Sequence, residues 1–178
     1  MSERAPLSSR LLGVRDTRPI ELNDITSLNE YLLFCADEGN HPQSCVQAAY
    51  EVSRFVPHGS SFVFLYPTYK YLYPRVGSLK EKFLIMVSGV LVPPKWKFHT
   101  LVRTKEQVID PMLIQPNLDL LDLQMYFEQT FTNLNSPFYV EVQTDKRNIF
   151  YDLAYIQRER PYFVPEFFAG ELLKFQLS

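Results

Sequence analysis

The sequence predicts one domain of the α+β class, in which helices come first and an antiparallel sheet follows. Two capped helical segments stand between residues 27 and 56, and the later segments are short and rich in Val, Ile, Phe and Tyr. A chain of 178 residues is long enough to bury a core and shelter a pocket. We expect residues 23–178 to form this domain and the polar residues 1–22 to form an irregular N-terminal arm.

Charge and residue usage exclude several classes of function. The chain has 18 Lys and Arg against 20 Asp and Glu, a net charge of −2, and so lacks the basic surface that nucleic-acid binding requires. Its two cysteines and three histidines do not stand at zinc-ligand spacings. We therefore expect no nucleic-acid partner, no metal and no other cofactor.

The sequence also lacks the marks of a membrane-spanning protein. Its first residues contain no apolar stretch of signal-peptide length, and no apolar run reaches the ~20 residues that a membrane span needs. Two cysteines are too few for a disulfide framework, which indicates a reducing compartment. We expect no membrane span, and a location in the cytoplasm or secretion into a host cell without a Sec signal peptide.

The first helix is expected over residues 27–38. Ser27 and Glu30 fit a capping box, in which the serine hydroxyl and the glutamate carboxylate satisfy backbone N–H groups at the start of a helix. Gly39 stands where this helix would end, and Pro42 breaks the chain after it.

A second helix follows directly and is the clearest local signal in the sequence. Ser44 and Gln47 form another capping box, and residues 57–59 contain the Pro and Gly that would end the helix. Cys45 falls in the first turn and is expected to point inward. Apolar residues at helical spacing line one face: Cys45, Ala48, Ala49, Val52, Phe55 and Val56.

The remaining segments indicate strands and one more helix. Asn117 fits the cap of a helix that continues to about residue 131. Residues 161–175 are too apolar for a free tail and are expected to pack on the domain, whereas the structure of 144–160 is left open. The strands are expected at 61–66, 82–92, 97–103, 107–110 and 138–143.

Cys45 is the candidate nucleophile. The unpaired N–H groups and the dipole at a helix start stabilise a thiolate, which is the form of cysteine that attacks a carbonyl carbon. A cysteine enzyme also needs a histidine that moves the proton and a third group that orients this histidine. His99 and Asp110 are the candidates for these two roles.

His99 and Asp110 are placed to meet across one hairpin. A two-residue loop that pairs Arg103 with Glu106 would put His99 directly opposite Asp110 on the same face. A four-residue loop that pairs Arg103 with Val108 would put them on a diagonal. Either register leaves the two side chains within reach of each other.

Structural roles explain each residue taken alone. A cysteine on the apolar face of a helix is most often a core residue, a single histidine is more often structural, and Asp110 before Pro111 fits a turn. The combination favours catalysis, because three independent coincidences would otherwise be needed.

The other candidates are weaker. Cys35 lies inside a helix and is expected in the core, His41 lacks an orienting partner, and His58 fits a turn. Trp96 either lines a substrate channel or packs against the domain. Four tyrosines either line a recognition surface or pack: Tyr66, Tyr69, Tyr71 and Tyr73.

The order of these parts resembles a known group of enzymes. Cys45 opens a helix, His99 follows on a strand and Asp110 ends the next one. This order resembles the Cys-His-Asp core of the transglutaminase-like and protein-glutaminase-like enzymes, a branch of the papain-like fold. The resemblance covers about residues 44–112 and implies a papain-like core, with N-terminal helices packed on an antiparallel sheet.

The resemblance also implies roles for the three residues. Cys45 would be the nucleophile, His99 the general base and acid, and Asp110 the residue that orients the imidazole. Many enzymes of this group have a tryptophan or a glycine directly beside the cysteine, whereas Ser44 and Val46 flank it here.

The expected activity is therefore cysteine-dependent amide hydrolysis. We favour deamidation of glutamine side chains in a partner protein through a thioester. The backbone N–H of Cys45 would bind the developing oxyanion with Gln43 or Asn40 as a side-chain partner, and Trp96 and Gln43 are the candidate substrate-binding residues. Two alternatives stay open: a cysteine peptidase, and a non-catalytic protein-binding module on the same fold.

Overall fold

The computed structural model describes five stretches of the chain: residues 24–40, 44–67, 71–118, 123–132 and 138–145. Several parts of the sequence discussed above lie outside these stretches, so their predictions stay predictions. They are the N-terminal arm, His41, Gln43, Tyr69, the apolar segment 161–175 and nearly all of 144–160.

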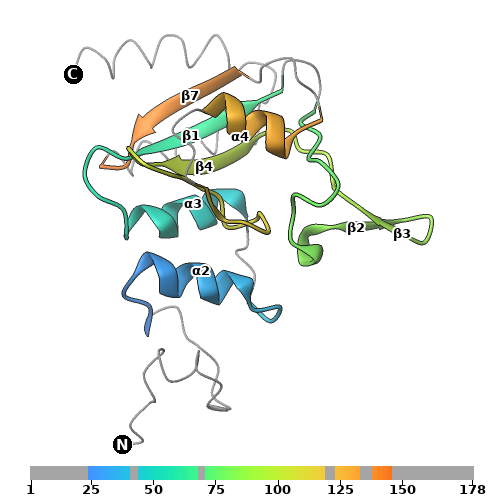
Figure 1. Ribbon diagram of the computed structural model, residues 1–178, viewed down its shortest axis with the longest axis horizontal. Helices are drawn as coiled ribbons and strands as arrows, with labels where there is room; N and C mark the ends of the chain where they lie inside the picture. The colour runs from blue at the N-terminus through green and yellow to red at the C-terminus, as the bar shows by residue number, and fades with distance from the viewer. Residues whose placement is uncertain (1–23, 41–43, 68–70, 119–122, 133–137, 146–178) are drawn as a thin grey trace, which may run out of the picture.

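The described fold has a sheet between helices (Figure 1). Helix α3 (Cys45–Ser53) packs along one face of the sheet, and α2 (Leu28–Ala36) lies on the far side of α3. Helix α4 (Leu123–Thr130) covers the opposite face. The predicted α+β class, with two helices before an antiparallel sheet, is confirmed.

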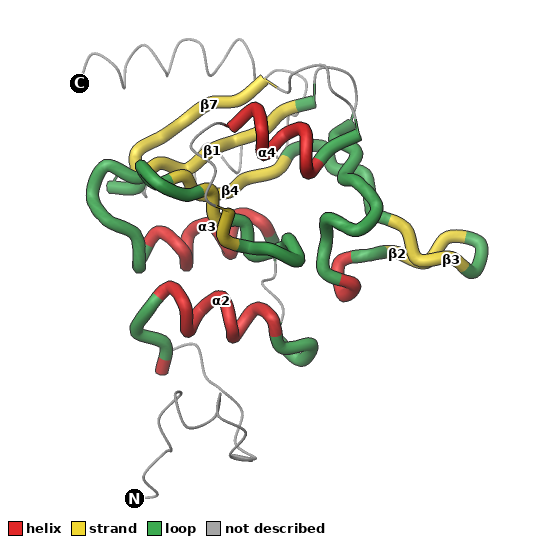
Figure 2. Tube along the Cα trace, viewed as in Figure 1, coloured by secondary structure: helices red, strands yellow, loops and turns green. Residues whose placement is uncertain are grey.

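The main sheet has five antiparallel strands in the order β6-β5-β4-β1-β7, of which β4, β1 and β7 are labelled in Figure 2. Strand β1, next to the central strand β4, pairs with β4 on one side and with β7 on the other. Strands β1 and β7 have the predicted bounds. The bounds are Ser61–Tyr66 for β1, His99–Arg103 for β4, Val108–Ile109 for β5, Asn117–Leu118 for β6 and Phe138–Gln143 for β7.

Successive side chains of β1 point to opposite faces of the sheet, and each face has its own hydrophobic core. Phe62 and Phe64 lie in one cluster with side chains of α2 and α3, and Val63 and Leu65 lie in another with Tyr126 of α4. All five side chains are fully buried. From Phe62 to Leu65 the strand is therefore apolar without interruption, as expected for a strand covered on both faces.

Both N-terminal helices begin at the predicted caps. The Oγ of Ser27 accepts a hydrogen bond from the backbone N–H of Glu30 at 3.2 Å, and that of Ser44 accepts one from Gln47 at 3.1 Å. The Glu30 carboxylate reaches back to the N–H and hydroxyl of Thr26. These contacts fix where the chain enters each helix.

Both helices end earlier than predicted. Helix α2 stops at Ala36 and α3 at Ser53, and Gly39 takes no part because the backbone is already extended at Asp37. The ammonium group of Lys82 donates to the backbone carbonyls of Cys35, Asp37 and Asn40. A distant lysine thus satisfies carbonyl groups at the end of α2 that the helix itself leaves unpaired.

The predicted strand 82–92 is wrong. Glu81–Phe83 is a short 3-10 helix, η2, and β2 (Ile85–Val87) and β3 (Val90–Val92) form a separate two-stranded hairpin. Ser88 and Gly89 turn the chain between them with positive φ angles of 49° and 81°.

The predicted helix from Asn117 is also wrong at its start. Asn117 and Leu118 form β6, where Asn117 pairs with Ile109 of β5, and α4 begins only at Leu123. In the part of the chain that the structure describes, no helix has the length and apolar character needed to cross a membrane.

Candidate active site

Cys45 is the first residue of α3. Ser44 before it is extended, and its hydroxyl caps the helix through Gln47. Cys45 is a free cysteine and is partly exposed, unlike Cys35, which is completely buried. A nucleophile at this place combines access for a substrate with the positive end of the helix dipole. The prediction that Cys35 belongs to the core is confirmed.

His99 and Asp110 are in direct contact. The distance from His99 Nε2 to Asp110 Oδ2 is 2.8 Å, and each side chain is 1% exposed. Arg103 pairs with Val108, so the four-residue loop is the register that the chain adopts, and the two side chains meet on the diagonal.

The contact shifts the pKa values of the two groups in opposite directions. Burial opposes the protonated imidazole, but the charge and hydrogen bond of Asp110, with smaller contributions from the Cys45 side chain, raise the pKa of His99 to about 10. Burial likewise opposes the Asp110 carboxylate, but its contacts with His99, Tyr126 and the Met112 N–H hold the pKa of Asp110 below its usual range. At neutral pH the pair is therefore an imidazolium and a carboxylate.

The Cys45 side chain lies near enough to His99 to add to the raised pKa of the imidazole. Because Nε2 of the imidazole is bound to Asp110, the ring nitrogen left for the sulfur is Nδ1. The structure therefore brings together the three residues predicted from the sequence: the partly exposed Cys45 lies beside His99, and His99 contacts the buried Asp110.

Tyr126 is a fourth member that the sequence did not reveal. Its hydroxyl donates to Asp110 Oδ2 at 2.6 Å, and its ring is fully buried. Burial, and after it the charge of Asp110, raises the pKa of Tyr126 well above the usual value, so the phenol keeps its proton. In the sequence, a tyrosine on the apolar side of a helix has no feature that separates it from an ordinary core aromatic.

Trp96 covers one face of the His99 ring. The two rings are stacked with centroids 4.4 Å apart and an angle of 20° between their planes. The Trp96 backbone is held by two hydrogen bonds to Leu72, of 2.7 and 2.9 Å, and its ring meets Phe131 edge-on. Because a protonated imidazole is attracted to an indole face, Trp96 both fixes and stabilises the imidazolium.

The loop after β5 holds the Asp110 carboxylate in place. Asp110 donates its backbone N–H to Pro116 and accepts the N–H of Met112 at Oδ1, 3.2 Å away. The Nζ of Lys80 donates to the Pro111 carbonyl at 2.7 Å. The carboxylate thus accepts at both oxygens and cannot rotate without breaking a contact.

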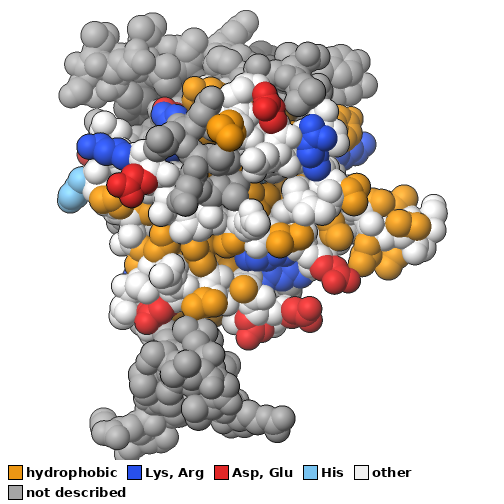
Figure 3. All heavy atoms as spheres, viewed as in Figure 1, with side chains coloured by type: hydrophobic (Ala, Val, Ile, Leu, Met, Phe, Trp, Pro, Cys, Tyr) orange, Lys and Arg blue, Asp and Glu red, His pale blue; other side chains and the backbone are white. Residues whose placement is uncertain are grey.

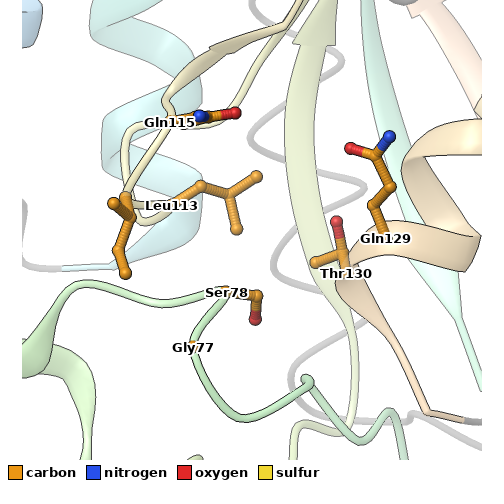
Figure 4. Close-up of a pocket in the computed structure, with 7 residues that line it drawn as sticks. Gly77, Ser78, Leu113, Gln115, Gln129 and Thr130 are labelled. Atoms are coloured by element: carbon orange, nitrogen blue, oxygen red, sulfur yellow. The ribbon is translucent and has the colours of Figure 1, made fainter.

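A cavity of about 210 Å³ lies beside this loop (Figure 4). Gln115 and Gln129 face it from opposite sides, and Thr130, one turn after Tyr126, forms part of its wall. Neither Cys45 nor His99 lines it. The lining residues are Gly77, Ser78, Leu113, Ile114, Gln115, Gln129 and Thr130.

Of the other candidates, His58, Tyr71 and Tyr73 lie within the described residues. His58 is exposed in a turn, as predicted. Tyr71 and Tyr73 contact each other edge-on, and Lys95 lies over the Tyr71 ring. Gln43 falls outside the described residues. Among the residues that are described, no three His, Cys, Asp or Glu side chains cluster in a way that could hold a metal ion.

Comparison of this chain with protein-family models, with curated proteins and with solved structures found no match. The case for a function therefore rests on the geometry of the site.

Proposed function

We propose that this chain is a cysteine-dependent amidohydrolase that deamidates glutamine side chains of a partner protein. The observation that carries the proposal is the placement of Cys45, His99 and Asp110: a partly exposed cysteine at a helix start lies beside a histidine that contacts a buried carboxylate. A papain-like or transglutaminase-like core is part of the proposal, supported by the nucleophile on a helix and the histidine on the strand beside it.

In the first half of the reaction, the Cys45 thiolate attacks the carboxamide carbon and a carbon–sulfur bond forms. The carbon–nitrogen bond of the tetrahedral intermediate then breaks, and the His99 imidazolium gives its proton to the departing nitrogen. Ammonia leaves and a thioester with Cys45 remains. The raised pKa of His99 supports this role, because the imidazole holds the required proton at neutral pH.

The oxyanion of the tetrahedral intermediate needs donors that already point at it. The first N–H groups of a helix have no partner within the helix, and the Ser44 hydroxyl satisfies only that of Gln47. The N–H of Cys45 is therefore the natural donor, and Gln43 is a second candidate from the sequence.

In the second half, water attacks the thioester carbon and neutral His99 takes a proton from it. The carbon–sulfur bond breaks, which releases a glutamate side chain and restores the Cys45 thiolate and the His99 imidazolium. Asp110 stays ionised throughout and stabilises the imidazolium at each stage.

The same triad could cleave a main-chain amide, so cysteine proteolysis is the second candidate within this class. The two reactions differ in their products. Deamidation releases ammonia and leaves the substrate chain intact, whereas proteolysis produces a new amino terminus. We favour deamidation because of the spacing of the triad and the small size of the chain.

The decisive experiment measures ammonia release and the substrate mass together. A blocked Gln-Gly dipeptide and an unfolded protein rich in glutamine serve as substrates, and the Cys45→Ala variant is compared with Cys35→Ala. We expect the wild type and Cys35→Ala to release ammonia and Cys45→Ala to release none. Shortened chains would favour the peptidase, and a wild type inactive on both substrates would favour the binding module.

A further inference from the structure

The hairpin of β2 and β3 projects from the body of the protein (Figure 1), and hydrophobic side chains gather on it (Figure 3). Ile85 pairs with Val92, Met86 with Leu91 and Val87 with Val90. Every one of the six strand residues is apolar.

Both faces of this hairpin are exposed. Paired residues of an antiparallel ribbon point to the same face, so Met86 and Leu91 share one face while Val87 and Val90 share the other. Met86 is 64% and Leu91 41% exposed on the first face, and Val87 and Val90 are 49% and 60% exposed on the second. A partner that covered a single face would leave the other apolar face in water.

The hairpin has the length of an interfacial anchor. Three residues per strand extend about 10 Å, which matches the ~5–10 Å to which apolar groups enter the interface of a bilayer and is far short of its ~30 Å core. The turn at Ser88 and Gly89 needs only two residues, so few backbone groups at the tip are unpaired.

Lysines flank the apolar tip on both sides. Lys80 and Lys82 precede it, Lys95 and Lys97 follow it, and Glu81 is the one acidic residue between positions 80 and 97. Lys95 and Lys97 are exposed. This segment carries a charge of +3 in a chain whose net charge is −2. Positive charge at the base of an apolar projection complements the anionic headgroups that surround an inserted tip.

We propose that the β2–β3 hairpin is a membrane anchor, which inserts its tip into the interface of a bilayer that contains anionic lipids. Insertion would surround both apolar faces with acyl chains at once and bring Lys95 and Lys97 to the level of the phosphates. Lys80 and Lys82, which precede the hairpin, donate to backbone carbonyls of the body and so tie its base to the rest of the protein.

Vesicle flotation of the 178-residue chain tests this proposal. The probes are vesicles of phosphatidylcholine alone and of phosphatidylcholine with phosphatidylserine. We expect the wild type to float with the anionic vesicles and to be released by salt. Met86→Asp should reduce the bound fraction at least tenfold, and Lys97→Gln should weaken binding roughly fivefold.

Met125→Asp is the matched control, since Met125 is 47% exposed on α4 and the substitution makes the same change of charge. It should leave flotation unchanged. The proposal fails if the wild type does not float with anionic vesicles, or if Met125→Asp weakens binding as much as Met86→Asp. It also fails if the hairpin instead mediates self-association, seen as a dimer that Met86→Asp dissociates without any flotation.

Discussion

His99 Nε2 lies 2.8 Å from Asp110 Oδ2 in a site where both side chains are almost completely buried. Two buried charges are costly to desolvate, and the loss of one partner leaves the other uncompensated. This desolvation cost argues against a purely structural role for the pair. The pair fits a site that must hold a charged imidazole beside a thiol.

Removal of the Asp110 charge should disable the proposed reaction. Asp110→Asn keeps the size of the side chain but loses the charge that raises the pKa of His99. We expect kcat for ammonia release to fall by roughly 10²- to 10⁴-fold. NMR titration of the imidazole should show a lower pKa of His99, and an unchanged pKa would contradict the assigned contact.

Tyr126→Phe should act through Asp110, because it removes only the hydroxyl that donates to Oδ2. Loss of a hydrogen bond to a charged group costs about 1.5–3 kcal/mol of the free energy of unfolding. The pKa of Asp110 should rise, so the acid limb of the pH–activity profile should move to higher pH. Tyr139→Phe is the control, since Tyr139 is 41% exposed, and it should change neither quantity.

The buried pair should make stability depend on pH in a predictable direction. The pKa of His99 rises on folding from 6.5 to about 10, so its contribution to stability is complete below pH 6.5 and is lost as the pH rises toward about 10. The pKa of Asp110 falls on folding, so its contribution is present above 3.8 and is lost at lower pH. Urea unfolding across this range should show the alkaline loss in the wild type and a smaller loss in His99→Gln.

The two cysteines should differ in reactivity in the folded protein. Cys45 is partly exposed beside His99, whereas Cys35 is fully buried and burial raises the pKa of its thiol. Iodoacetamide at neutral pH should label Cys45 quickly and Cys35 only after unfolding, as read by peptide mass spectrometry. His99→Ala should slow the labelling of Cys45. Equal rates for both thiols would show that the site has no activated cysteine.

Local signals in the sequence were sufficient for the starts of the two N-terminal helices and for the triad candidates. Ser27 and Ser44 mark helix starts because a capping hydroxyl satisfies a backbone N–H within three residues, so no tertiary information is needed. His99 and Asp110 lie on neighbouring strands of one hairpin, and both possible registers keep them close.

Predictions failed where tertiary contacts decide the outcome. An apolar run such as 82–92 does not show whether it crosses a core or turns back at Ser88 and Gly89. Asn117 has a residue type that caps helices, but pairing with Ile109 draws it into the sheet. Tyr126 could not be found because its partner, Asp110, belongs to a different element.

The positions of His99 and Asp110 relative to the sheet have a consequence for thermal inactivation. His99 lies on β4, which pairs with β1 in the central part of the sheet. The backbone amide protons of β4 should therefore exchange only on global unfolding. Asp110 follows β5, which has two residues and is bordered by the equally short β6 at the sheet edge. Opening of this edge would separate the carboxylate from the imidazole while the rest of the fold persists. On heating, activity should therefore disappear before the secondary structure does.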